Sequence, residues 1–529
     1  MIRKSSFLFD SERGTFYHME QPKLPVIAPI LKGFHPDPSI CRVGDDFYLV
    51  TSTFEFYPGV PVFHSRDLIR WELINYCLTR PDQVDLTGVS ASGGIWAPTI
   101  RCHNGRFYMT TTCVHGKQDN FIVWTDDIRG EWSCAHHVAQ DGIDPSLFFD
   151  DDGKVYFCSA RSVNGKNQID ACEINPDTGE MLTEPVCISY GSGGIYPEGP
   201  HIYKKDGIYY LLLAEGGTGY RHMVTVLRAP SPYGPYESCP HNPVLTHLNL
   251  QEDPIQATGH ADIIEDQNGR WWLVCLGFRP LDSRELHVLG RESFLAPMHW
   301  EDGWPVIGNH GRLAPLSDFA HLLPARPEKR PIGADDFFDD FTAARLSPQY
   351  AFIRSCDARR YSLEPGKGRL TLSGAGVHLC DAEATPVFLG VRQREFCGIC
   401  QANLTVEAGT LAGITAFYND SYHYAAFVEN RGGKIHAGIK KAIHDIRIHT
   451  RTAELTSANV TLTLRFNREW YEFSVTSGYD TFILGRGAVA GLCSECVAAH
   501  SFTGVFLGMY CESGHVQFRS FRISYSEDR

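Results

Sequence analysis

The chain has 529 residues and a formal net charge of −14 at pH 7. This length suits two or three domains rather than a single core. Aromatic residues make up 12% of the chain, glycines number 49 and methionines only 7, which is typical of an all-β protein and excludes a helix bundle. An acidic chain without a block of Lys and Arg is a poor binder of nucleic acid or anionic membranes. We therefore expect a neutral polar ligand.

The N-terminal segment and the cysteines bear on the compartment. The first apolar run, residues 7–9, is too short for a signal peptide, and no stretch approaches the 18 apolar residues of a membrane-spanning helix. The 17 cysteines are odd in number and scattered, which indicates reduced thiols rather than a disulfide framework. We expect a cytoplasmic protein with no membrane partner, and the sequence is compatible with both a monomer and an oligomer.

A tight turn followed by an aromatic strand recurs five times along the first 320 residues. Asn-Gly and Asp-Gly pairs in these turns supply the positive φ angles of a two-residue hairpin. The turn glycines are spaced by 61, 48, 54 and 62 residues, slightly more than one four-stranded propeller blade. The repeat predicts a five-bladed β-propeller over residues 25–323. The five glycines are Gly44, Gly105, Gly153, Gly207 and Gly269.

The strand before each hairpin carries a marked residue seven or nine positions ahead of the turn glycine. These residues are Asp37, Pro98, Asp144, Glu198 and Asp262. The first strand of a propeller blade lines the central channel. We therefore expect the carboxyl groups of Asp37, Asp144 and Glu198 to converge at one mouth of the channel.

The composition changes after the predicted propeller. Residues 324–334 are charged and punctuated by proline, as in a linker. The strands that follow alternate apolar and polar residues, for example in 460–465 and 516–524, which predicts a β-sandwich over residues 335–529. Residues 1–24 form an N-terminal extension to which the sequence assigns no function.

The three acids have unusual local sequences. Asp37 lies between two prolines, Asp144 lies between Ile143 and a proline, and Glu198 lies between a proline and a glycine. One such acid alone is an ordinary turn residue, but three at matching positions favour chemistry. Hydrolysis of a glycoside needs one carboxylic acid and one carboxylate, and a third carboxylate nearby raises the pKa of the acid. Phe54 and Trp96 are candidates for stacking on a sugar, with core packing as the alternative.

Several motifs, in chain order, resemble glycoside hydrolase family 43, in particular its β-xylosidases and α-L-arabinofuranosidases. They are HPDPSI, GGIWAP, GIDPSLFFDDDGKVYF, YPEGPHIYKKDGIYYLLLAEGGT and QATGHADIIED. The resemblance implies a five-bladed propeller followed by a concanavalin-like jelly-roll sandwich. It also implies that Asp37 is the general base, Glu198 the general acid, and Asp144 the residue that tunes the pKa of Glu198 and orients it. An inverting mechanism would place Asp37 and Glu198 roughly 6.5–9.5 Å apart.

The same resemblance suggests residues that contact the sugar. It implies that Arg291 reaches sugar hydroxyls, and that Phe54, Trp96 and the sandwich residue Phe502 form the walls of the pocket. His260 resembles a channel histidine that in some relatives helps to hold calcium through water, although the sequence favours a hydrogen-bonded core histidine. No cofactor is required, and calcium in the central channel is left open. Many relatives have asparagine where this chain has His35, next to the predicted base.

The sequence thus predicts an exo-acting, inverting glycosidase that releases a terminal pentose from small xylo-oligosaccharides, that is, a β-xylosidase. The alternative is an α-L-arabinofuranosidase, with both activities in one site as a further option. A non-catalytic sugar-binding propeller is the remote alternative, and the presence of all three acids argues against it.

Overall fold

The computed structural model describes residues 27–250, 253–281, 286–326, 335–498 and 501–526, together with the backbone of a short hairpin, β1 (Phe7–Asp10) and β2 (Thr15–His18). Most of the predicted N-terminal extension and residues 327–334 of the predicted linker lie outside the described residues. Among those described, no helix is long and apolar enough to cross a membrane.

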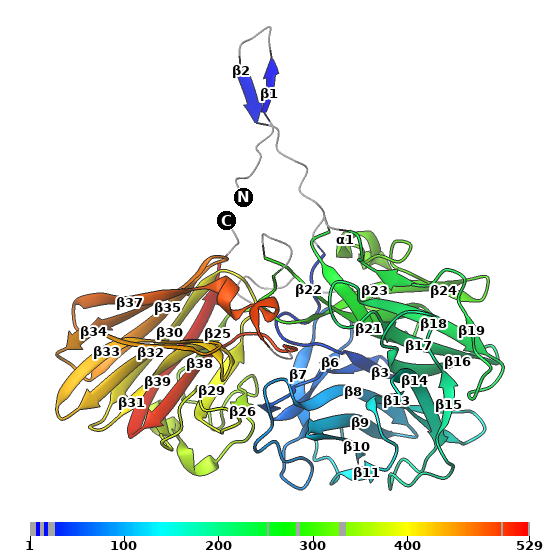
Figure 1. Ribbon diagram of the computed structural model, residues 1–529, viewed down its shortest axis with the longest axis horizontal. Helices are drawn as coiled ribbons and strands as arrows, with labels where there is room; N and C mark the ends of the chain where they lie inside the picture. Colours follow the sequence, from blue (N-terminus) through cyan, green and yellow to red (C-terminus); the bar gives the residue numbers. More distant parts are fainter. Residues whose placement is uncertain are drawn as a thin grey trace.

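Five antiparallel sheets follow one another in the first part of the chain and form the predicted propeller (Figure 1). Blade 1 comprises β3 (Ser39–Val43), β4 (Asp46–Val50), β6 (Gly59–Ser65) and β7 (Glu72–Leu78). Blade 2 comprises β8 (Gly94–His103), β9 (Arg106–His115), β10 (Lys117–Thr125) and β11 (His136–Val138). Blade 3 comprises β12 (Ile143–Phe149), β13 (Val155–Val163), β14 (Lys166–Glu173) and β15 (Val186–Ser189). Blade 4 comprises β16 (Glu198–Lys205), β17 (Ile208–Glu215), β18 (Met223–Ala229), β19 (Glu237–Ser238) and β20 (Leu245–Thr246). Blade 5 comprises β21 (Gln256–Glu265), β22 (Trp271–Phe278), β23 (Glu292–Glu301) and β24 (Trp304–Ile307).

The first two strands are joined by the predicted two-residue turn in blades 1, 2 and 4, whereas in blades 3 and 5 five residues join them. Asn104 and Gly105 have φ angles of 51° and 83°, and Asp206 and Gly207 have φ angles of 51° and 78°. Two successive positive φ angles match the type I′ turn, whose twist suits a two-residue hairpin. The other three hairpins share only the left-handed glycine, with φ angles of 62° at Gly44, 86° at Gly153 and 75° at Gly269.

The C-terminal part is a sandwich of two antiparallel sheets, as predicted. After helix α1 (Leu316–Phe319) and the 3-10 helix η1 (Ala320–Leu322), the chain enters the first sheet. That sheet comprises β25 (Phe337–Asp339), β27 (Tyr361–Glu364), β28 (Arg369–Ser373), β30 (Gly398–Val406), β35 (Asn459–Phe466), β36 (Trp470–Ser477), β37 (Asp480–Ala488) and β39 (His515–Tyr525). The other sheet comprises β29 (Val387–Arg392), β31 (Leu411–Asn419), β32 (Tyr422–Arg431), β33 (Lys434–Ile443), β34 (Ile446–Leu455) and β38 (Phe506–Ser513). Short 3-10 helices lie between strands: η2 (Ala358–Arg360), η3 (Pro365–Lys367), η4 (Val489–Leu492) and η5 (Ser494–Cys496).

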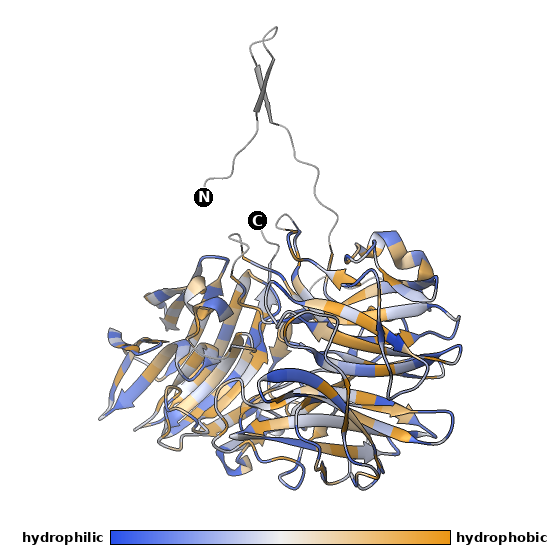
Figure 2. Ribbon diagram, turned by 45° about the vertical axis from the view of Figure 1, so that its right-hand side comes forward, coloured by the Kyte–Doolittle hydropathy of each residue, from blue (hydrophilic) through white to orange (hydrophobic). Residues whose placement is uncertain are grey.

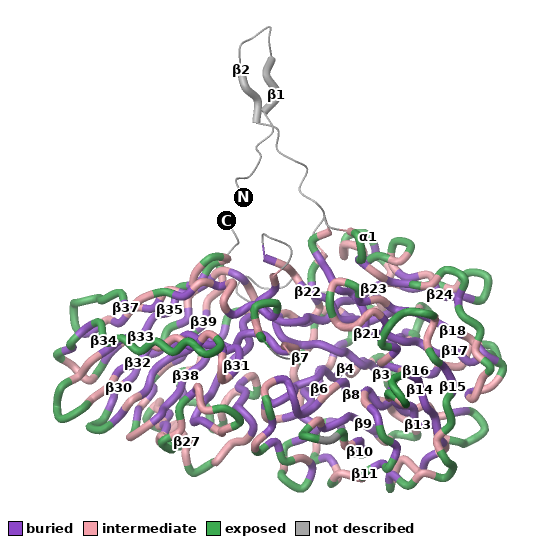
Figure 3. Tube along the Cα trace, viewed as in Figure 1, coloured by how far each residue is buried: buried purple, intermediate pink, exposed green. Residues whose placement is uncertain are grey.

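Apolar and polar residues alternate along many strands of the sandwich (Figure 2), and buried residues concentrate in the strands of both domains while exposed ones gather in loops (Figure 3). In β36 every second residue is buried, so that Tyr471, Phe473 and Val475 face the space between the two sheets. This period of two is what places a continuous apolar core between two sheets.

The sandwich packs directly on the propeller. Strand β5 (Phe56–Tyr57) of the propeller pairs with β26 (Phe352–Ile353) of the sandwich, and one apolar cluster contains residues of both domains, including Phe34, Phe56 and Phe506. The rings of Phe56 and Phe506 stack with centroids 4.1 Å apart. This contact brings the sandwich to the mouth of the propeller at which the three acids lie.

Candidate active site

Bulges in the inner strands turn the predicted site residues into one cavity. The register shifts between Trp96 and Thr99 in β8, between Ile143 and Ser146 in β12, and between Glu198 and His201 in β16. A β-bulge re-aims a side chain and often lies beside an active site. Three of the inner strands therefore share one structural device for presenting a side chain to the mouth of the channel.

Each of these bulges contains a left-handed residue that directly precedes a proline. The φ angle is 54° at Asp144, 30° at Ala97 and 57° at Gly199, and it is 54° at Asp37, just before β3. Left-handed backbone at a residue other than glycine is strained and persists only where the surroundings enforce it. Asp37 and Asp144 are therefore held in equivalent, strained positions of two blades, whereas in blade 4 the equivalent residue is Gly199 and Glu198 precedes it.

Asp37 is buried and surrounded by groups that favour its ionised form. Its Oδ1 accepts a hydrogen bond from Arg291 Nη1 at 3.0 Å, and its Oδ2 accepts one from Ser52 Oγ at 2.6 Å. His260 Nδ1 lies 3.7 Å from Oδ1. Burial alone raises the pKa of this carboxyl, but the charge of Arg291, the nearby His260 and the bond from Ser52 outweigh it and leave the pKa below its usual value. Asp37 is therefore a carboxylate at neutral pH.

Glu198 has the opposite electrostatic environment. Burial raises its pKa well above the usual value, and the negative charges of Asp144 and Asp37 raise it further. The pKa of Asp144 is also raised, first by burial, while its Oδ2 accepts a hydrogen bond from the backbone N–H of Gly199 at 3.0 Å. That bond ties Asp144 to the residue after Glu198. One carboxyl of the site is thus held neutral beside another that is held ionised.

Three aromatic rings from both domains form one wall. The ring centroids of Phe54 and Phe502 lie 5.8 Å apart, those of Trp96 and Phe502 5.4 Å, and those of Phe54 and Trp96 6.1 Å. The guanidinium of Arg291 lies over the rings of Phe54 and Phe502, at 5.6 and 5.5 Å from their centroids. Arg291 Nη2 also donates to the carbonyl of Phe502 at 3.3 Å. The sandwich therefore supplies part of the wall through Phe502.

Ser92 connects these aromatic residues to one another. Its backbone carbonyl accepts from Trp96 Nε1 at 3.0 Å, and its Oγ accepts from the backbone N–H of Phe502 at 3.0 Å. Its own N–H donates to Glu55 Oε2 at 3.0 Å. Glu55 is almost fully buried, and burial raises its pKa to about 8. Ser92 and Glu55 thus hold the propeller wall and the sandwich residue in register.

The cavity enclosed by these groups has a volume of about 70 Å³. Thr218, after β17, lies on its wall and accepts a hydrogen bond from Arg291 Nη1 at 2.8 Å through Oγ1. All eight residues that the sequence assigns to catalysis or to contacts with the sugar lie around this one cavity. They are Asp37, Phe54, Trp96, Asp144, Glu198, His260, Arg291 and Phe502.

The central channel contains the guanidinium group of Arg101. Arg101 Nη1 donates to Asp262 Oδ2 at 2.7 Å, and Arg101 Nη2 lies 3.0 Å from His201 Nδ1. The Asp262 carboxylate also accepts from Ser39 Oγ at 2.6 Å and from the Tyr203 hydroxyl. Calcium needs six to eight oxygen ligands, so a carboxylate already saturated beside a guanidinium does not fit it. The described residues contain no group of three or more His, Cys, Asp or Glu arranged to hold a metal ion. Calcium held at His260 through water molecules, which the sequence leaves open, stays a prediction.

Comparison with known proteins agrees with this geometry. The model of glycosyl hydrolases family 43 matches residues 27–305, and that of the β-xylosidase C-terminal concanavalin A-like domain matches residues 338–524. The chain belongs to glycosyl hydrolase family 43. It is 40% identical over 503 residues to the non-reducing end α-L-arabinofuranosidase BoGH43B of Bacteroides ovatus, covering 92% of this chain and 91% of that protein. It is 37% identical over 511 residues to a xylosidase/arabinosidase of Butyrivibrio fibrisolvens, covering 92% and 95%.

Solved structures of the family share the whole architecture. The crystal structure of xylan β-1,4-xylosidase from Bacillus halodurans has a TM-score of 0.85 and 33% identity, covering 94% of this chain and all of that one. The Bacteroides ovatus structure of GH43B from a xyloglucan locus has a TM-score of 0.86 and 37% identity, covering 95% and 100%. The protein is thus a glycosidase with a family 43 propeller followed by a concanavalin-like sandwich.

Sequence reasoning missed the partners of the site residues. The sequence assigns no role to Ser52, Glu55 or Ser92. It also assigns none to Thr218, the last residue of the AEGGT segment. Most of their contacts join residues 15 to 410 positions apart, so only the fold reveals them. For Thr218, the glycines before it were an available signal, because they allow close approach of the backbone.

Proposed function

We propose that this glycosidase is exo-acting and inverting, and that it releases a terminal pentose from small oligosaccharides. The supporting observation is the pairing, in one small cavity, of a carboxyl whose pKa is lowered with another whose pKa is raised well above its usual value. Such a division matches a general base and a general acid acting near neutral pH. The reaction needs no cofactor.

In this mechanism Asp37 takes a proton from a water molecule that attacks the anomeric carbon. Glu198 gives its proton to the oxygen of the leaving group, and Asp144 keeps that proton on Glu198 through its negative charge. Arg291 and His260 lie beside Asp37 and would donate hydrogen bonds to sugar hydroxyls. The separation of Asp37 and Glu198 stays a prediction of roughly 6.5–9.5 Å, the span that admits a water molecule.

The size of the cavity and its aromatic wall favour a single terminal sugar. The cavity has a volume of about 70 Å³, and Phe502 of the sandwich lies across it. Phe54 and Trp96 offer faces on which a pyranose or furanose ring would stack. The small volume of this cavity supports attack at chain ends.

We propose xylose as the principal sugar and therefore β-xylosidase activity. The second candidate is α-L-arabinofuranosidase activity, favoured by the name of the relative with 40% identity. Assays with nitrophenyl β-D-xyloside and nitrophenyl α-L-arabinofuranoside separate the two. Proton NMR of the first product anomer should show inverted configuration. Release of neither nitrophenol would contradict the proposal.

Two variants test the assigned acid and base. Glu198→Ala should lower kcat by 10²–10⁴-fold on xylobiose, and much less on dinitrophenyl xyloside, whose leaving group needs no proton. Asp37→Ala should lower kcat on both substrates, because the water is no longer activated. Equal losses on both substrates in Glu198→Ala would refute its role as the acid.

A further inference from the structure

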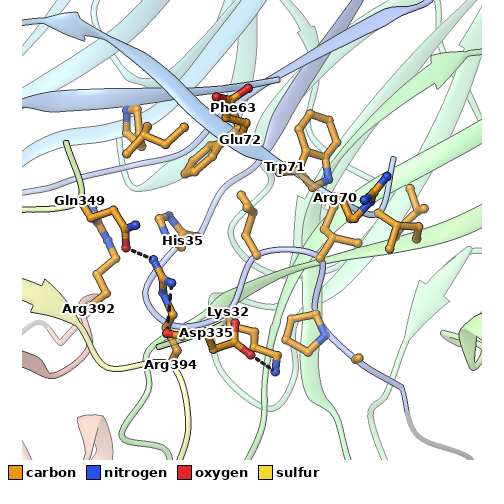
Figure 4. Close-up of a pocket in the computed structure, with 18 of the residues that line it drawn as sticks. Lys32, His35, Phe63, Arg70, Trp71, Glu72, Asp335, Gln349, Arg392 and Arg394 are labelled. Carbon is orange, nitrogen blue, oxygen red and sulfur yellow. Dashed lines mark hydrogen bonds and ion pairs between the residues drawn. The ribbon is translucent and has the colours of Figure 1, made fainter. Parts of the chain in front are cut away.

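A large cavity lies between the two domains, away from the three acids. Its volume is about 730 Å³, within the range of small-molecule sites. The propeller supplies residues 27–32 and parts of β6 and β7, and the sandwich supplies residues 347–349 and the end of β29 (Figure 4). A ligand in this cavity would touch both domains at once.

The cavity contains a buried arginine, Arg392, for which the described residues supply no counter-ion. Arg392 is 5% exposed, and among the described residues no carboxylate lies within 4.0 Å of its guanidinium. Its Nε donates to the carbonyl of Phe34 at 2.8 Å, and the rest of the guanidinium lies beside the Tyr76 hydroxyl and over the rings of Phe34 and Phe506. Burial and the nearby charge of Arg394 lower the pKa of Arg392. A buried charge without a partner is costly, so this arrangement favours an added anion.

Arg394 adds a second positive charge to the same wall. Its Nη2 donates to Gln349 Oε1 at 2.6 Å and its Nη1 to the carbonyl of Asp335 at 3.4 Å, so both acceptors are neutral (Figure 4). The pKa of His35 is well below its usual value because of burial and the charges of Arg392 and Arg394. His35 therefore stays uncharged near the two guanidinium groups and adds no positive charge of its own.

The remaining walls suit a flat, sugar-sized body. Phe63 and Trp71 contribute rings from the propeller side. Of the acids in the lining, Asp335 accepts from Lys32 at 2.8 Å and is thus already paired, while Glu72 is exposed. An aromatic surface opposite two arginines is the combination that recognises an oxyanion on a ring.

We propose that the interdomain cavity binds a monosaccharide-sized anion, a sugar acid or a sugar phosphate. Its oxyanion would lie between Arg392 and Arg394, and its ring would lie against Phe63 and Trp71. The site is separate from the catalytic cavity and does not depend on the sugar that the enzyme hydrolyses. His35 lines this cavity and lies two residues before Asp37 in the chain. Its backbone N–H donates to the carbonyl of Arg291 at 3.0 Å.

Isothermal titration calorimetry on the full chain tests this site. D-Glucuronate and D-glucose 6-phosphate are compared with uncharged D-glucose. At least one of the two anions should bind at least tenfold more tightly than glucose, and the one that binds identifies the sugar acid or the sugar phosphate as the ligand class. Binding of neither anion above the level of glucose would overturn the proposal.

The variant Gln349→Glu is the sharpest test of location. It keeps the size of the side chain and its contact with Arg394, but it supplies an internal carboxylate that competes with the ligand. Affinity for the anion should fall at least tenfold. Gln517→Glu is the matched control, because Gln517 Oε1 also accepts from an arginine, Arg369, at 3.1 Å but lies outside the cavity lining. It should leave binding unchanged.

Arg394→Gln removes a positive charge and should weaken binding by a similar factor. Thermal unfolding followed by circular dichroism establishes that each variant is folded. Should Arg394→Gln not fold, the conservative Gln349→Glu variant still decides. Anion binding that is unchanged in Gln349→Glu would place the anion elsewhere, for example beside Arg291, and would refute the interdomain site.

Discussion

The three acids illustrate how neighbours, rather than residue type, assign chemical roles. Asp37 keeps its charge because Arg291 and Ser52 bond to it, whereas Glu198 keeps its proton because burial and two carboxylates disfavour ionisation. The local sequences identify all three as unusual, yet they do not distinguish the base from the acid. From the sequence, only the family resemblance assigns the proposed base and the proposed acid. In the structure, contacts between blades support the same assignment.

Asp144→Asn should shift the pH profile of kcat/KM. The charge of Asp144 raises the pKa of Glu198, so its removal lowers that pKa and moves the alkaline limb of the profile to lower pH. The acid limb, which the proposed mechanism assigns to Asp37, should move less, and in the same direction. The asparagine Oδ1 can still accept from Gly199, so the fold is retained. An alkaline limb that stays in place would contradict the proposed role of Asp144.

Ser92→Ala should loosen the aromatic wall without unfolding the protein. The variant removes the oxygen that accepts from the Phe502 N–H, a bond worth about 1 kcal/mol. A loss of about 1 kcal/mol in binding free energy corresponds to a KM that is roughly 3- to 10-fold higher. We expect a smaller change in kcat. Ser457→Ala, which removes a similar bond to the N–H of Asn459 far from the cavity, is the control. Equal kinetics in the two variants would show that Ser92 does not position Phe502.

At the scale of elements, the five blades were predictable and the exact phase of the inner strands was only partly so. The residues of a turn themselves determine the hairpin that it forms, and therefore Asn-Gly and Asp-Gly pairs predict the repeat of hairpins from the sequence. Asp37 and Asp144 do occupy equivalent positions, but Asp262 lies deeper, where it bonds to Arg101. Strand β21 has two register shifts, and such bulges depend on the neighbouring strand rather than on local sequence.

The bulge in β16 gives a prediction about Gly199. A methyl group there would lie 3.1 Å from Nε2 of His260, at a φ of 57° that disfavours side chains by about 1–2 kcal/mol. Gly199→Ala should therefore displace Glu198 and His260 and lower kcat at least tenfold. Gly207→Ala is the control: its φ is 78° but nothing lies within 4 Å of the added methyl. It should cost comparable stability in urea unfolding and leave kcat intact, and equal kcat losses would refute the argument.

The order of strands in the sandwich illustrates what sequence patterns leave undetermined. Alternation predicts strands such as β39, but not that β39 lies between β28 and β30. That pairing joins residues more than 100 positions apart, for example Leu370 with Phe518. Local propensity carries no information about such partners, and the burial pattern only selects which face points inward.

At the scale of the whole molecule, the domains form one enzyme because their interface is both apolar and ionic. Arg279 of the propeller bonds to Glu292 at 2.7 Å and to Glu395 of the sandwich at 2.6 Å. Phe34 and Phe56 are fully buried in the cluster shared with Phe506. The interface thus supports the catalytic wall, which is incomplete without Phe502.

A chain that ends at residue 326 should therefore fail as an enzyme even though it retains all three acids. It would expose Phe34, Phe54 and Phe56 and lose the β5–β26 pairing, so we expect aggregation, or a kcat/KM on the aryl pentoside that is at least 100-fold lower. A full-length chain cleaved at a protease site inserted between Glu328 and Lys329 is the control. It should remain associated in size-exclusion chromatography and active, because the interface and not the covalent connection holds Phe502 over the cavity. A truncated propeller that is monomeric and fully active would show instead that the sandwich is dispensable for catalysis.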